Sequence, residues 1–218
     1  MWVDALYILQ DNNHREDWEN ECAKMAVIYE GSYVTIAATR AADCNAGCLP
    51  SLPALQPLRY AIRGTDNLHK TTYLRDPPDN TNFFASVGRA EDYPLFQRAW
   101  CFQERILASR ILHCSQSEYV FEYGNGVICE DGCLNDKVGQ IHLKSRYGHI
   151  LRHNSKGVKA RAGSEVMECW ISLIADYTSK YFTYVKDTLP ALSGLASRMP
   201  RDLCGSYLAG LWEHNLGR

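Results

Sequence analysis

The chain has 218 residues, of which 46% are apolar and 22% charged, a composition typical of a globular domain. A chain of this length is predicted to fold around one hydrophobic core, because a single core usually serves up to about 250 residues. With 23 basic and 25 acidic side chains, its net charge is −2. No overall positive field is available to attract phosphates, so we expect no nucleic-acid partner.

The apolar runs are interrupted within a few residues, well short of the roughly 20 that a membrane-spanning helix needs. Met1 is not followed by the basic segment and apolar stretch of a secretory signal. The chain has nine cysteines, an odd number that argues against a full set of disulfides. We therefore expect reduced thiols in a cytoplasmic protein without a membrane span.

The first elements are predicted from residues 2–38. Residues 2–9 read Trp-Val-Asp-Ala-Leu-Tyr-Ile-Leu, which predicts a buried strand with an abrupt start. A helix should follow, opened by a capping box of Asn13 and Glu16 and ended by Gly31. Residues 33–38, Tyr-Val-Thr-Ile-Ala-Ala, predict a second strand. This order favours a βαβ crossover with a parallel strand pair.

The composition of the sequence changes after residue 40, where prolines separate short segments with β-strand character. A helix near 96–107 should lead into a meander of three strands, and two amphipathic helices should follow near the C-terminus. The expected strands of the meander are 110–114, 119–123 and 127–129. The expected parts begin with an α/β part at residues 1–39 and a loop-rich β insertion at residues 40–93. A helix with the meander should follow at residues 94–134, then a mobile loop at residues 135–163 and a helical C-terminal part at residues 164–218. The predicted fold class is α/β, a small mostly parallel sheet flanked by helices.

Four segments together resemble the fungal heterokaryon incompatibility (HET) domain. Residues 2–11 are similar to the family's Trp-[Ile/Val]-Asp-[Ala/Ser]-Leu-Cys-Ile-x-Gln-Asp segment, with Tyr7 where the family usually has Cys. Residues 98–110, Arg-Ala-Trp-Cys-Phe-Gln-Glu-Arg-Ile-Leu-Ala-Ser-Arg, resemble its Arg-[Ala/Gly]-Trp-x-x-Gln-Glu-Arg-x-Leu-x-x-Arg segment and are the most specific. Residues 187–196 and 207–212 complete the set in the family's order.

The resemblance implies an effector or signalling module of fungal non-self recognition and programmed cell death, acting through self-association or protein partners. It also implies an incomplete TIR-like, flavodoxin-like core, because the family places a further strand before the Trp-Val-Asp segment and the domain here looks truncated. Some TIR-like relatives hydrolyse NAD. An NAD-cleaving hydrolase, with NAD as substrate and no cofactor, is therefore one alternative, and a non-functional remnant is another.

The resemblance makes Glu21 and Glu104 the candidate catalytic residues of the enzymatic alternative, because NAD-cleaving TIR-like proteins use a glutamate on a helix beside the central sheet. Helix glutamates are also commonly solvated, so both interpretations stay open. Asp4 lies in an apolar run, where a carboxylate is costly to bury unless it is paired. It is expected either to face a crevice or to pair with an arginine such as Arg98 or Arg105.

A polar pocket is the candidate binding site, and its residues are Asp4, Arg98, Trp100, Gln103 and Arg105. Helical spacing places Arg98 and Arg105 on one side, so the two arginines could hold a phosphate or carboxylate. The alternative is a structural clamp that ties the helix to neighbouring strands.

Two Cys-x₃-Cys pairs raise the question of zinc. They are Cys44 with Cys48 and Cys129 with Cys133, with His113 and His142 in the neighbourhood. Structural zinc sites more often use two intervening residues, and the two pairs are far apart in the chain. No metal site is expected.

Overall fold

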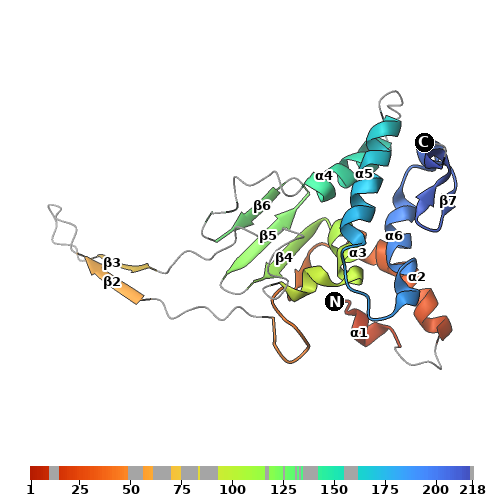
Figure 1. Cartoon of the computed structure of the whole chain (residues 1–218). Coiled ribbons are helices and arrows are strands. Elements are labelled where there is room, and N and C mark those ends of the chain that lie inside the picture. The colour runs from red at the N-terminus through yellow and green to blue at the C-terminus, as the bar shows by residue number, and fades with distance from the viewer. Residues whose placement is uncertain are drawn as a thin grey trace.

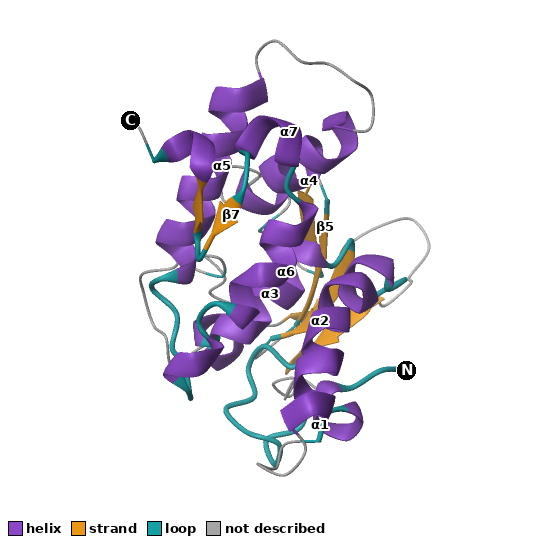
Figure 2. Cartoon of the chain, turned by 90° about the vertical axis from the view of Figure 1, so that its right-hand side faces the viewer, coloured by secondary structure: helices purple, strands orange, loops and turns teal. Residues whose placement is uncertain are grey.

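The computed structural model describes residues 1–9, 15–48, 56–60, 70–74, 83, 93–115, 118–124, 126–130, 132, 134, 142–154 and 162–216. Within these residues, a four-stranded sheet lies beside a group of helices, and a two-stranded hairpin stands away from the sheet (Figure 1). Seen from the helical side, the helices lie in front of the strands (Figure 2).

The sheet has the strand order β1-β4-β5-β6. Its strands are β1 (Thr35–Ala37), β4 (Arg110–Cys114), β5 (Tyr119–Tyr123) and β6 (Gly126–Cys129). Strand β1 pairs with β4 in parallel, whereas β4–β5 and β5–β6 are antiparallel. The prediction of a mostly parallel sheet is therefore wrong: the sheet is mixed, because only a few residues separate β4 from β5 and β5 from β6, too few for a parallel crossover.

The N-terminal segment is not the predicted strand. Residues Asp4–Tyr7 form one helical turn, α1, in which the Asp4 carboxylate accepts a hydrogen bond of 2.8 Å from the backbone N–H of Ala5. Leu6 is 78% exposed, and Ile8 is buried. An apolar run becomes a strand only where another strand pairs with it, and no described strand pairs with residues 2–9. The expected parallel partner of β1 is replaced by β4.

Helix α2 (Arg15–Gly31) follows as predicted and ends at Gly31. Its buried face carries Met25 and Ala26, and half-buried Trp18, Cys22 and Tyr29 extend this face at helical spacing. Asn13, the expected cap, lies outside the described residues.

The β insertion contains one hairpin among its described residues. Strands β2 (Gln56–Tyr60) and β3 (Lys70–Leu74) pair in antiparallel register. Further along, Phe83 is buried against the rings of Tyr93 and Phe96, 5.0 and 5.4 Å away between ring centroids. Phe83 thus packs with the meander strands in a small second core.

Helix α3 (Ala99–Leu107) leads into β4, β5 and β6, which confirms the predicted helix and meander. The segment 135–163, expected to be a mobile loop, instead contains helix α4 (His142–Asn154). Leu143, Tyr147, Ile150 and Leu151 pack against the helical core from this helix. Their spacing of four, three and one is helical, but the surrounding basic and polar residues obscure it.

The C-terminal part is helical, as expected. Its elements are α5 (Ala162–Tyr177), α6 (Pro190–Arg198), α7 (Arg201–Cys204), β7 (Tyr207–Leu208) and β8 (Leu211–Trp212). Short 3₁₀ turns occur at Pro94–Gln97, Val185–Asp187 and Glu213–Asn215. No helix within the described ranges has the length and apolar character needed to cross a bilayer.

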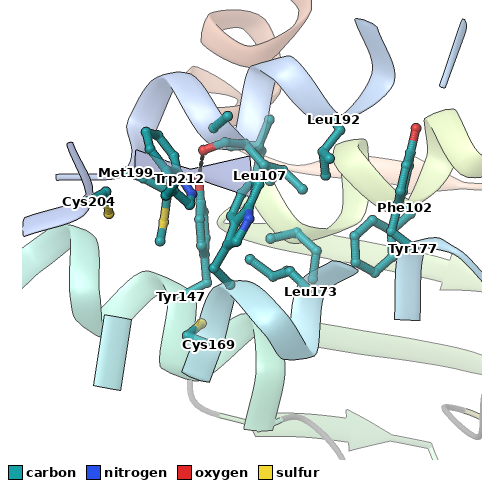
Figure 3. Close-up of a cluster of buried hydrophobic side chains, with 14 of the residues drawn as sticks. Phe102, Leu107, Tyr147, Cys169, Leu173, Tyr177, Leu192, Met199, Cys204 and Trp212 are labelled. Carbon is teal, nitrogen blue, oxygen red and sulfur yellow. Dashed lines mark hydrogen bonds between the residues drawn. The ribbon is translucent and has the colours of Figure 1, made fainter. Parts of the chain in front are cut away.

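The main core joins α3, α4, α5, α6 and the C-terminal hairpin (Figure 3). Two polar groups inside it find backbone partners: the Tyr147 hydroxyl donates to the carbonyl of Leu195 at 2.9 Å, and the Trp170 indole N–H donates to the carbonyl of Gly210 at 2.9 Å. Gly210 has φ of +102°, a conformation that favours glycine and turns β7 into β8. These hydrogen bonds fix the orientations of the Tyr147 and Trp170 rings within the core.

The two faces of the sheet differ. The inner face, which carries His113, Val120, Glu122 and Cys129, is buried. The opposite face, here called the outer face, carries one apolar side chain from each strand in direct register, and these are Ile36, Leu112, Phe121 and Ile128. Ile36 is 61% exposed and Ile128 is 48% exposed. The outer face is therefore an apolar surface that reaches solvent.

Candidate functional site

Helix α3 supplies most of the residues singled out by the sequence. It begins after Arg98, where the backbone N–H of Ala99 donates to the carbonyl of Tyr181 at 3.2 Å, and the N–H of Tyr181 donates to the carbonyl of Gln97. This exchange ties the start of α3 to the segment after α5. The side chains along α3 point into three different surroundings, which are described in turn.

The first surrounding is a carboxylate cluster formed by Asp4, Tyr29, Arg98, Cys101 and Glu104. Burial, and after it the charge of Asp4, raise the pKa of Glu104 from 4.5 to about 7, against the opposing effects of Tyr29 and Arg98. The pKa values of Tyr29 and Cys101 are also raised, first by burial and then by the charge of Glu104. Three helices, α1, α2 and α3, therefore bring their polar groups together here.

A carboxyl group with a pKa near 7 can hold or release a proton at neutral pH. The charge of Asp4 is one of the causes of the raised pKa of Glu104, because a nearby negative charge disfavours ionisation. Glu104 therefore has a pKa suited to a general acid or base.

The second surrounding contains Arg105, which points to the sheet and not to Glu104. Its guanidinium donates to both carboxylate oxygens of Glu122, Nε to Oε2 at 3.0 Å and Nη2 to Oε1 at 3.2 Å. Lys144 of α4 also approaches Glu122, with Nζ 3.8 Å from Oε1. Arg105 thus ties α3 to β5, which is the clamp that the sequence offered as one of two alternatives.

Glu122 also contacts His113, whose Nε2 lies 2.9 Å from Oε2, while His113 Nδ1 lies 2.9 Å from the Thr39 hydroxyl. Burial lowers the pKa of His113, so the ring is neutral at pH 7. The consistent arrangement is that Nε2–H donates to Glu122 and the Thr39 hydroxyl donates to Nδ1. The result is a hydroxyl–imidazole–carboxylate chain that is buried from end to end.

The charges of this network are held away from solvent. Burial alone would raise the pKa of Glu122, but Arg105, the His113 hydrogen bond and Lys144 together lower it well below its ordinary value. Burial lowers the pKa of Lys144 to about 8. Its Nζ has no hydrogen-bond acceptor among the described atoms. The network links the loop after β1 with α3, β4, β5 and α4, and we interpret it as structural.

The third surrounding involves Trp100 and Gln103. The Trp100 indole N–H donates to the carboxylate of Asp187 at 3.2 Å, and its ring meets that of Trp18 edge to face. The buried side chain of Gln103 lies against Gly194 of α6, where a Cβ atom would come within 2.8 Å of it. Gln103 therefore sets the close approach of α3 and α6, and its position is that of a packing residue.

Glu21 is not brought to the carboxylate cluster. Its carboxylate pairs with Lys24 one turn along α2, at 2.6 Å. It is not among the groups that shift the pKa of Glu104. The structure thus brings Asp4, Arg98 and Glu104 together, and it separates them from Glu21 and Arg105.

No three His, Cys, Asp or Glu side chains gather as metal ligands would in the part of the chain that the structure describes. Of the Cys-x₃-Cys pairs, Cys44 and Cys48 are exposed and Cys129 is buried, whereas Cys133 lies outside the described residues. His113 is engaged with Thr39 and Glu122.

Sequence reasoning missed Tyr29, Glu122, Lys144 and Asp187 as members of these clusters. A signal was present for Glu122, which sits in the middle of the apolar strand Tyr-Val-Phe-Glu-Tyr, where a carboxylate must find partners. No comparable pattern marks Lys144, because its helix was not expected.

Comparison with protein families gave one match, in the N-terminal part of the chain. Residues 1–104 match the family model described as heterokaryon incompatibility protein (HET). The chain carries a HET domain at residues 1–104. The comparisons with curated proteins and with solved structures gave no significant match.

The HET match runs from α1 to Glu104 in α3, so it includes Asp4, Tyr29, Arg98 and Glu104 of the carboxylate cluster. The partners of Arg105 on β5 and α4 lie beyond the matched range. The carboxylate cluster thus belongs to the HET domain itself, whereas the buried network joins that domain to the rest of the chain.

Proposed function

We propose that this HET-domain chain is an effector or signalling module of fungal non-self recognition and programmed cell death, acting in the cytoplasm through contact with protein partners or with itself. The HET match over residues 1–104 supports the family role. The observation that carries the mode of action is the apolar outer face of the sheet, to which Ile36 of the HET domain contributes.

The chemistry of the outer face suits a protein contact. Ile36, Leu112, Phe121 and Ile128 form one row across all four strands. Among the described strand positions that point outward, Arg110 carries the charge, and its guanidinium already donates to the carbonyl of Tyr33 at 3.0 Å. An exposed apolar surface with little charge is typical of a docking site.

The size of the outer face favours a small docking element. Four strands about 4.8 Å apart, with at most five residues of about 3.3 Å each, cover no more than about 19 by 17 Å, or about 300 Å². A stable dimer usually buries about 800 Å² on each partner. The face therefore fits one helix or strand of a partner better than a stable homodimer built on this face alone.

The test is induced expression in yeast, with growth as the readout. Wild-type chain should arrest growth, and Ile36→Asp or Ile128→Asp should relieve the arrest because a charge on the outer face opposes apolar docking. Ile171→Asp is the matched control: Ile171 is 53% exposed on α5, away from the outer face. Arrest by both outer-face variants at equal protein level would contradict the proposed docking role, and growth with the wild-type chain would favour an inactive remnant.

A second candidate function is NAD cleavage, and the specific observation in its favour is Glu104. Its pKa of about 7 and the adjacent Asp4 suit a carboxylate that handles charge and protons, and Arg98 offers a cation beside them. Arg105 is already bound to Glu122 and is not available to a pyrophosphate. Glu104→Gln should stop NAD loss in the yeast cells under this alternative, whereas unchanged NAD during wild-type growth arrest would rule it out.

A further inference from the structure

Helices α4 and α5 border a cavity in a part of the chain that the HET match does not reach. Its volume is about 420 Å³, within the range of about 300–1,000 Å³ that is typical of small-molecule sites. The residues that line it are Ser145, Arg146, His149, Ile150 and Glu165. The cavity therefore combines donors, an acceptor and an apolar side chain.

Helix α4 supplies four of the lining residues as one continuous patch. Ser145 and His149 are four positions apart, and so are Arg146 and Ile150, which places the four side chains next to one another within two turns. Ile150 also packs against the main core, so the patch has a fixed apolar base. Helix α5 lies beside α4 (Figure 1), and Glu165 in its first turn supplies a carboxylate from this second wall.

The polar groups of the cavity are available to a ligand. Arg146 is 40% exposed, and its Nη2 lies 3.8 Å from Oε2 of Glu168, which is beyond hydrogen-bonding distance. Glu168 instead accepts a hydrogen bond of 3.0 Å from the Ser164 hydroxyl. Among the described residues, the side chains of Ser145, Arg146 and Glu165 make no hydrogen bond with one another or with any other group.

The charge pattern favours an anionic group on the α4 wall. From Lys137 to Ser164 the sequence has seven Lys or Arg and no Asp or Glu, although the net charge of the chain is −2. This local positive excess attracts a phosphate dianion more strongly than a singly charged group. The planar guanidinium of Arg146 can donate two hydrogen bonds to one phosphate, and the Ser145 hydroxyl adds a further donor.

The α5 wall favours a different part of the ligand. The carboxylate of Glu165 repels a phosphate but accepts hydrogen bonds from hydroxyl groups, and carboxylates commonly bind ribose hydroxyls in this way. A ligand that satisfies both walls carries a phosphate at one end and hydroxyl groups at the other.

We propose that the cavity between α4 and α5 binds a phosphate monoester that carries hydroxyl groups, with ribose 5-phosphate as the unit recognised. Arg146 and Ser145 donate to the phosphate, and Glu165 accepts from the hydroxyl groups. The unit occurs both in pentose phosphates and in nucleotides. The proposal is independent of the docking face and of NAD cleavage, because it uses none of their residues.

The test is isothermal titration calorimetry of the purified full chain with ribose 5-phosphate, AMP, inorganic phosphate and ribose. The two esters should bind at least about tenfold more tightly than phosphate or ribose, because only the esters engage both walls. Tighter binding of AMP would identify a nucleotide, and equal or weaker binding would identify a pentose phosphate. Either result supports the site.

Two variants separate the two walls. Arg146→Gln should weaken the binding of ribose 5-phosphate about tenfold or more, because a hydrogen bond to a charged group is lost. Glu165→Ala should remove most of the preference for ribose 5-phosphate over inorganic phosphate. Arg201→Gln is the matched control and should bind as the wild type does, since Arg201 is exposed on α7 and does not line the cavity.

Four results would overturn the inference. One is the absence of saturable binding of both esters at concentrations up to about 10 mM. Another is wild-type affinity in Arg146→Gln, and a third is an equal loss in Arg201→Gln, which would indicate nonspecific attraction. The fourth is equal affinity for ribose 5-phosphate and inorganic phosphate in the wild-type chain, which would exclude the proposed class of ligand.

Discussion

Glu104 is a half-buried carboxyl group whose pKa in the folded chain, about 7, exceeds its ordinary value of 4.5. Between these two pH values the folded chain holds a proton that the unfolded chain has released, so this residue's contribution to stability falls as pH rises from about 4.5 through 7. After a discount for partial exposure, ionisation costs the fold about 1–2 kcal/mol.

Glu104→Gln should therefore raise the free energy of unfolding by about 1–2 kcal/mol at pH 8 and change it little at pH 4.5. Urea unfolding at the two pH values measures this difference. Glu21→Gln is the control, because its partner Lys24 is exposed and a surface pair contributes about 0–1 kcal/mol. An equal effect of Glu104→Gln at both pH values would show that the carboxyl group does not titrate in this range.

Glu122 has the opposite role, because it accepts hydrogen bonds from Arg105 and His113 and lies 3.8 Å from the Lys144 ammonium group. Glu122→Gln keeps the shape but leaves Arg105 and Lys144 without their counter-ion, which should cost about 3–5 kcal/mol. The exposed pair of Arg146 and Glu168 offers a control, and Glu168→Gln should cost less than about 1 kcal/mol in the same thermal or urea unfolding. A loss below 1 kcal/mol for Glu122→Gln would contradict the network as described.

At the scale of elements, the contact between α3 and α6 depends on a glycine. A Cβ at Gly194 would lie 2.7 Å from the end of the Gln103 side chain, which is buried and would have to shift within the core. Gly194→Ala should therefore destabilise the chain by about 1–3 kcal/mol. Gly163→Ala in α5, where a Cβ would meet nothing within 4 Å, should instead stabilise it by about 0.4–1 kcal/mol. Melting curves that shift in the same direction for both variants would contradict this packing.

The sequence predicts some elements well because their signals are local. The three strands of the meander follow from β-rich runs separated by turn residues, and α2, α3, α5 and α6 follow from helical spacing. The segment 2–9 shows the limit: its apolar run has strand character, but whether it pairs depends on a partner elsewhere, and β4 is the strand that pairs with β1.

The candidate site was predictable only in part for the same reason. Helical spacing places Arg98 and Arg105 on one side of α3. Arg98, however, precedes the helix and its charge acts on Glu104, whereas Arg105 donates to Glu122. The partners of long side chains lie on other helices and strands. The spacing of residues within one helix does not identify those partners. The position of Glu122 in an apolar strand indicated a buried partner without saying which one.

At the scale of the whole molecule, the described helices lie to one side of the mixed sheet (Figures 1 and 2). The outer face of the sheet carries the apolar row. The carboxylate cluster lies within the HET domain, between α1, α2 and α3. The molecule thus offers two separate places where function could reside, a docking face and an acid–base cluster. Their residues are different, so single substitutions distinguish them.

The most direct measurement compares colony formation in yeast upon induced expression of four chains at equal protein level: wild type, Ile36→Asp, Ile171→Asp and Glu104→Gln. The docking account predicts that the wild type, Ile171→Asp and Glu104→Gln reduce colony number about tenfold or more, while Ile36→Asp restores growth. Restored growth with Glu104→Gln alone, together with continued arrest by Ile36→Asp, would contradict it and assign the activity to the carboxylate cluster.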